Sequence, residues 1–186
     1  MTSARPPRAD AVRNRAKIMG AAHEQITAHG PGVSMEQIAA AAGVAVGTLY
    51  KHFLTKTELV AAVVAASITA VADDAEAARR RAANGSRALE EITGFLTRLV
   101  DTAAHDHAVK AAARTLNAAD PATREDEARA TRALGELIHA AQTAGDLRAD
   151  FTVDDLYLLF STAPTDQPSA VRARWLTLLL TGLAAR

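Results

Sequence analysis

The sequence predicts an all-α protein of about nine helices, and three observations lead to this prediction. The 186 residues are rich in alanine, leucine, glutamate and arginine, which are good helix formers. Aromatic residues make up only 4% of the chain and β-branched runs are few, which disfavours sheets. Apolar residues recur three and four positions apart between glycine, proline and asparagine breakers, as they do on the buried face of a helix.

The N-terminal third predicts an arm followed by a long helix. Residues 1–9 are expected to form a flexible arm, because two consecutive prolines cannot join a helix interior. A helix is expected over residues 10–29, where apolar side chains are spaced four apart. The Gly-Pro-Gly of residues 30–32 should end this helix.

Two short helices are expected next. Ser34 and Gln37 form a capping-box pattern that opens a helix ending at Gly43, and a further helix is expected over residues 46–53. Their turn contains a glycine and they follow a longer helix, which is a helix-turn-helix pattern. The expected small core of this pattern consists of Ile38, Ala39, Val44, Leu49 and Phe53.

The remaining two thirds predict a helical bundle. Thr55 should cap a long connecting helix that ends at the breaker Asn84-Gly85. Further helices are expected over residues 87–104, 106–116, 122–144, 152–163 and 169–183.

The last two of these helices are apolar nearly all the way round, so each should expose an apolar face. Two such hairpins related by a two-fold axis would form a four-helix homodimer interface. The residues expected in that interface are Leu156, Leu159, Phe160, Trp175, Leu178 and Leu179.

The charge distribution favours a nucleic-acid partner at one end of the chain. The net charge is zero, but residues 1–56 carry seven lysines and arginines against three acids. This excess of +4 suits a polyanion. The chain has no cysteine, no signal-like N-terminus and no apolar run long enough to span a bilayer. A cytoplasmic protein without membrane contact is therefore expected.

The polar residues of the expected helix-turn-helix carry a family resemblance. Ala42-Gly-Val44, Thr48-Leu-Tyr-Lys-His-Phe53 and Lys56 resemble the pattern of the TetR family of bacterial transcriptional repressors over residues 10 to about 64. The resemblance implies that a homodimer binds double-stranded operator DNA. It implies phosphate contacts for Thr48, Tyr50, His52 and Lys56, and positions close to base edges for Ser34, Ala45, Val46, Gly47 and Lys51.

Two positions depart from the family pattern. Ala45 stands where a serine or threonine cap is common, so about 1 kcal/mol of helix capping should be lost. Val46 stands where a longer polar side chain is common. Direct base readout would then depend on thymine methyl groups and on Lys51 to guanine, with DNA shape supplying part of the specificity.

The resemblance also implies three regions: an arm over residues 1–9, a DNA-binding domain over 10–56, and an effector-binding and dimerisation domain over 57–186. An unidentified small-molecule effector would release a repressor from a palindromic operator. A set of apolar residues either lines its pocket or forms ordinary core: Val64, Ile68, Phe95, Leu99, Leu116, Leu134 and Ile138.

An alternative function is a small-molecule carrier with a vestigial helix-turn-helix. An enzyme is not expected, because no nucleophile, phosphate-loop or dinucleotide motif is present. No cofactor and no metal are expected. His105 and His107 are two positions apart on a helix, so they point to different sides.

Overall fold

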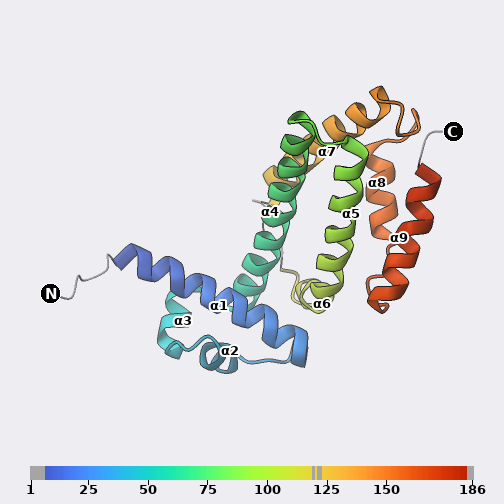
Figure 1. Ribbon diagram of the computed structural model, residues 1–186. Helices are drawn as coiled ribbons and strands as arrows, with labels where there is room; N and C mark the ends of the chain where they lie inside the picture. Colours follow the sequence, from blue (N-terminus) through green and yellow to red (C-terminus); the bar gives the residue numbers. More distant parts are fainter. Residues whose placement is uncertain (1–6, 119, 121–122, 184–186) are drawn as a thin grey trace. The chain divides into compact units, whose positions relative to one another are not determined.

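The computed structural model describes residues 7–118, 120 and 123–183, and within them the chain forms nine α-helices (Figure 1). This confirms the predicted all-α class. The helices are α1 (Pro7–His29), α2 (Met35–Ala41), α3 (Val46–His52), α4 (Lys56–Ala83), α5 (Ala88–His105), α6 (His107–Thr115), α7 (Thr123–Thr143), α8 (Val153–Ser161) and α9 (Ser169–Leu183).

The helix ends follow the local chemistry of the sequence. The Ser34 hydroxyl accepts a hydrogen bond from the Gln37 amide at 3.2 Å, and the Gln37 side chain accepts one from the Ser34 amide at 2.7 Å. The predicted capping box is therefore confirmed. Helix α1 begins at Pro7, three residues earlier than predicted, because proline is tolerated in the first turn of a helix, where its missing N–H is not needed. The other six residues of the predicted arm lie outside the described residues.

The chain divides into two compact units. The first comprises Met1–Ala66 and Asp106–Pro121, and the second comprises Ser67–His105 and Ala122–Arg186. These units differ from the predicted domains, because the start of α4 and all of α6 fall in the unit that holds α1, α2 and α3. The physical reason is packing, since apolar residues of both segments are buried in the first core.

The first unit is built around side chains that are fully or almost fully removed from water. Helix α1 contacts α2, α3 and α6. The predicted core residues Ile38, Ala39, Leu49 and Phe53 are all buried, and Val44 is half-buried against them. Helix α6 adds further apolar side chains to the same core, which explains why it belongs to this unit: Val109, Ala112 and Ala113.

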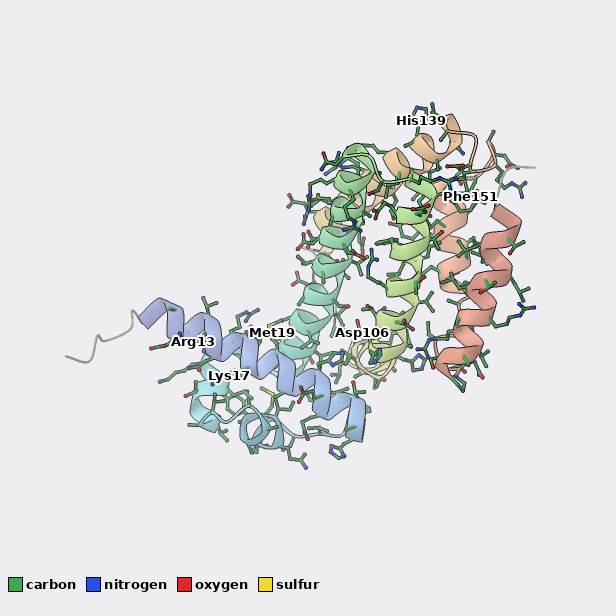
Figure 2. The ribbon with its side chains drawn as sticks, viewed as in Figure 1. Arg13, Lys17, Met19, Asp106, His139 and Phe151 are labelled. Carbon is green, nitrogen blue, oxygen red and sulfur yellow. The ribbon has the colours of Figure 1, made fainter. Side chains whose placement is uncertain are left out.

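One partly buried polar contact also joins α1 to the start of α6. The His23 Nε2 and the Asp106 Oδ1 are 2.8 Å apart, and Asp106 is only 7% exposed. Asp106, which is labelled in Figure 2, is the residue that precedes α6. A buried carboxylate needs such partners, because removing a charge from water is costly. The pair therefore fixes the start of α6 against α1.

The second unit has a core formed mainly by α5 and α7. Helix α5 is strongly amphipathic and buries Ile92, Phe95 and Leu96. It contacts α7 and α9, and α7 also contacts α8 (Figure 1). Leu134 and Leu137 of α7 pack into the same cluster.

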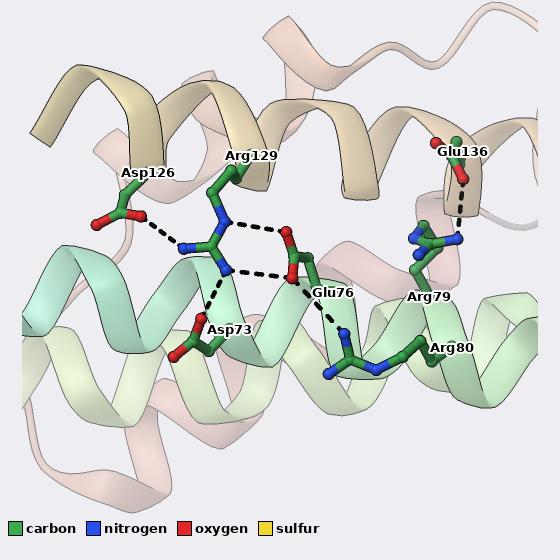
Figure 3. A network of polar contacts seen from close by, with 7 residues as sticks. All are labelled: Asp73, Glu76, Arg79, Arg80, Asp126, Arg129 and Glu136. Atoms are coloured by element: carbon green, nitrogen blue, oxygen red, sulfur yellow. Dashed lines mark hydrogen bonds and ion pairs between the residues drawn. The ribbon is translucent and has the colours of Figure 1, made fainter.

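A group of charged side chains joins α4 to α7 within the second unit (Figure 3). The Arg129 guanidinium donates to Asp73 at 2.7 Å, to both oxygens of Glu76 at 3.0 and 3.1 Å, and to Asp126 at 2.6 Å. These bonds raise the pKa of Arg129 and lower the pKa of Glu76. The pKa of Asp126 is lowered first by a hydrogen bond from the Thr69 hydroxyl and then by the bond from Arg129. The Asp126 carboxylate also accepts a bond from Thr69 of α4 at 2.5 Å.

In the described part of the chain, no single helix is long and apolar enough to cross a bilayer. Helices α3 and α4 meet such a test only as a pair bent by 65°, and only by length and composition.

Candidate nucleic-acid interface

The turn between α2 and α3 sets how the two helices meet. Gly43 has a φ of +65°, in the left-handed region that favours glycine. The Val44 amide then donates to the Ala39 carbonyl at 3.0 Å, and the Gly43 amide donates to the Ala40 carbonyl at 3.1 Å. These bonds close the end of α2 and redirect the chain into α3.

Helix α3 presents one face to the core and the opposite face to water. Leu49 is fully buried, and Phe53, which follows the helix, is 1% exposed. Val46, Gly47, Tyr50 and Lys51 are exposed. Positions i, i+1, i+4 and i+5 lie on one side of a helix, so these residues share one surface. Thr48 and His52 are half-buried at its margins.

The start of α3 has the weak cap that the sequence predicts. Ala45 is the N-cap residue, with φ −64° and ψ 142°, and no side chain caps the helix. The Ala45 carbonyl still accepts bonds from the Thr48 and Leu49 amides at 2.8 and 3.2 Å. Ala45 is exposed, so a longer side chain could be accommodated there in the free protein.

A carboxylate that no sequence pattern indicated lies beside the exposed face of α3. The Tyr50 hydroxyl donates to Glu36 of α2 at 3.5 Å. The pKa of Glu36 is lowered, first by its own backbone amide and then by the Ser34 hydroxyl, with a smaller effect from Tyr50. The carboxylate is therefore charged at neutral pH. Ser34, a predicted base-edge residue, is half-buried beside it.

Lys56 is half-buried and makes contacts that the sequence pattern did not reveal. Its ammonium donates to the backbone carbonyls of Pro31 and Val33 in the loop between α1 and α2. An ammonium has three protons, so one remains for another acceptor. Lys56 thus holds the loop that leads into α2, in addition to the phosphate contact predicted for it.

Basic side chains of α1 belong to the same unit. The Arg15 guanidinium lies 4.4 Å from the centre of the Phe53 ring, a cation–π distance. Arg13 pairs with Asp10, and Lys17 is exposed (Figure 2). The contact between Arg15 and Phe53 could be found only from the fold, because 38 positions separate the two residues in the sequence.

The seven predicted pocket residues are divided between the two compact units. Phe95, Leu134 and Ile138 are at most 4% exposed and form core of the second unit, whereas Ile68 and Leu99 are half-buried there. Val64 and Leu116 belong to the first unit and pack against its core. The sequence allowed these residues to be either pocket lining or ordinary core, and the three buried ones are core.

The six predicted interface residues differ in exposure. Leu156 is 1% exposed and lies in the core of its own chain, so it has no surface left for a partner. Leu159, Trp175 and Leu179 are half-buried against that core, and Phe160 is half-buried. Leu178 is 58% exposed. Three further large apolar side chains on α8 and α9 are exposed and were not predicted: Tyr157, Leu158 and Val171.

Comparisons with known proteins give two family matches. Residues 18–63 match the N-terminal model described as bacterial regulatory proteins, tetR family. Residues 87–185 match the model described as the C-terminal domain of SbtR-like transcriptional regulators. Together the two models cover most of the chain, but they leave out about the first half of α1 and all of α4 after residue 63.

Solved structures agree with these matches. A TetR transcription regulatory protein from Mycobacterium vanbaalenii is 36% identical, with a TM-score of 0.76 over 97% of this chain and 100% of that one. A TetR transcriptional regulator from Streptomyces coelicolor is 27% identical, with a TM-score of 0.71 over 92% and 98% of the two chains. None of the curated proteins compared matches this chain.

Proposed function

Because this chain belongs to the TetR family of bacterial transcriptional regulators, we propose that it is a repressor that a small molecule releases from its operator. DNA binding and homodimerisation are general properties of the family. The proposal concerns the direction of regulation, the residues that contact DNA and the means of release. We also propose that it acts in the cytoplasm, where its DNA would be.

The observation that carries the proposal is the exposed face of α3. Val46, Gly47, Tyr50 and Lys51 face water while Leu49 anchors the helix from behind. A helix held in this way can enter a major groove and place its first residues against base edges. Two such helices of a dimer would lie about 34–36 Å apart and bind an inverted repeat.

Exposed apolar side chains on α8 and α9 support dimerisation through these helices. Leu158 and Leu178 are 62% and 58% exposed. Large apolar side chains at such exposure favour burial against a partner. A second copy of the same hairpin would bury them symmetrically.

Selection from random DNA followed by transcription in vitro tests the proposal. The purified protein is expected to enrich an inverted repeat and to lower transcription from a promoter that contains it. If transcription rises on addition of the protein, the protein is an activator and the proposed repression is wrong. Failure to enrich any sequence would favour the carrier with a vestigial helix-turn-helix.

A further inference from the structure

A hollow of about 580 Å³ opens in the first unit, between α4 and α6. The residues that line it are Val64, Lys110, Ala113, Arg114, Asn117 and Ala118. Two of them have been described above, since Ala113 belongs to the core of this unit and Val64 packs against that core. The volume lies within the range of small-molecule sites, which is about 300–1,000 Å³.

Helix α6 supplies most of the residues that line the hollow, because one face of the helix is turned to the hollow and another face is buried in the core. Lys110, Ala113, Arg114 and Asn117 follow the spacing i, i+3, i+4 and i+7, so they form one stripe along the helix and its end. Another stripe of α6, which includes Val109 and Ala112, is buried in the core of the unit. The first stripe is therefore held in place by the packing of the second.

The lining combines an apolar floor with two positive charges. Val64, Ala113 and Ala118 supply apolar surface, whereas Lys110 and Arg114 lie one helical turn apart. Arg114 is exposed and Lys110 is half-buried. No acidic side chain lines the hollow among the described residues. Two cations beside apolar surface match a ligand that carries an anionic group on an apolar skeleton, whereas a small inorganic anion would leave the apolar floor uncovered.

We infer that this hollow binds an anionic amphiphile, a molecule with a carboxylate or sulfonate group on an apolar ring or chain. The apolar part lies against Val64, Ala113 and Ala118. The anionic group accepts charge-assisted hydrogen bonds from Lys110 and Arg114.

The position of the hollow links such a ligand to the DNA-binding helices. Helix α6 is joined to α1 by the buried core and by the His23–Asp106 contact at 2.8 Å. A ligand between α4 and α6 therefore contacts two helices whose apolar side chains share a buried core with those of α1. The inference names an effector class for the proposed regulator and so rests on that function, but binding at the hollow is measurable without DNA.

Two fluorescent probes of the same skeleton test the inference. The anionic probe is 1-anilinonaphthalene-8-sulfonate, and the neutral control is N-phenyl-1-naphthylamine, which lacks the sulfonate. Each is titrated into the full-length protein. The expected result is a saturable site for the sulfonate with one probe per protomer, and much weaker binding of the neutral probe.

Substitutions locate the site. The double substitution Lys110→Gln and Arg114→Gln should lower the affinity for the sulfonate probe by about tenfold or more, because two charged donors are lost. Ala118→Trp should also reduce binding, because it fills the hollow and leaves both charges in place. The matched control is Arg124→Gln with Arg132→Gln, which removes two exposed arginines of α7 and should leave binding unchanged.

Equal sulfonate affinity in the wild type and in the Lys110/Arg114 double variant would overturn the inference, as would equal binding of the two probes. Operator binding is measured on the same proteins. If the double variant binds operator but has unaltered probe binding, the inferred binding site is wrong, whereas the proposed function as a regulator is retained. If the wild type binds no operator, the proposed function fails, whatever the probes show.

Discussion

Replacing Gly47 with alanine should stabilise the fold and weaken DNA binding at once. Gly47 lies in the first turn of α3, and a Cβ atom built there meets no heavy atom within 4 Å. Alanine in a helix is more stable than glycine by about 0.5–1 kcal/mol. For a chain of this size, that gain raises Tm by about 1–4 °C.

The same methyl group should be harmful in the complex. If the start of α3 lies against base edges, a methyl group at position 47 occupies space that the DNA needs. We expect operator affinity to fall by about tenfold, which corresponds to about 1.4 kcal/mol. Affinity is measured by fluorescence anisotropy with labelled operator DNA, and stability by thermal unfolding at a fixed protein concentration.

Gly43→Ala is the matched control, because its effect on stability has the opposite sign. A Cβ at Gly43 also meets nothing within 4 Å, but the φ of +65° is unfavourable for alanine. The left-handed conformation costs about 1–2 kcal/mol, so Tm should fall. A Gly47→Ala protein that binds operator as tightly as the wild type would refute the placement of α3 against DNA. A Gly47→Ala protein that melts earlier would refute the stability argument.

Further substitutions test the neighbouring features. Ala45→Ser supplies the missing cap of α3 and should stabilise the protein by about 1 kcal/mol, which chemical denaturation would detect. Lys51→Gln should cost about 1–3 kcal/mol of operator binding and relax the preference at one base pair, as read by selection from random DNA. Glu36→Gln removes a negative charge beside Tyr50, so operator affinity should rise several-fold, and an unchanged affinity would place Glu36 away from DNA. Leu178→Glu should leave the protomer folded, because this side chain is 58% exposed, but should shift the protein towards monomer in sedimentation experiments.

Local signals in the sequence predict most of the helix ends. The capping box at Ser34, the turn glycine Gly43 and the breaker at residues 84–85 all act over a few residues, and the structure has helix ends at each of them. The core residues Leu49 and Phe53 were also predictable, because the spacing of apolar residues in a helix determines which side chains share a face.

Long-range contacts could not be predicted in the same way. Lys56 donates to carbonyls more than twenty positions earlier, and Asp106 pairs with His23 across 83 positions. Neither contact leaves a periodic trace in the sequence. The assignment of α6 to the first unit also depends on long-range packing, because the apolar residues of α6 do not indicate in the sequence which core they join.

Apolar residues posed a different difficulty. The sequence gives the same pattern for a pocket lining, a core and a subunit interface, because all three require apolar side chains at helical spacing. Only the exposed fraction separates them: Leu156 is 1% exposed and Leu178 is 58% exposed, although both lie in helices of similar composition.

The most direct test of the account is binding of the purified protein to the DNA upstream of its own gene, titrated at two salt concentrations. The account predicts tight binding with two protomers per site, an affinity that falls steeply as salt increases, and a protected inverted repeat. Binding no tighter than to random DNA, together with failure to enrich any sequence from random DNA, would contradict the placement of α3 in the major groove and with it the central claim.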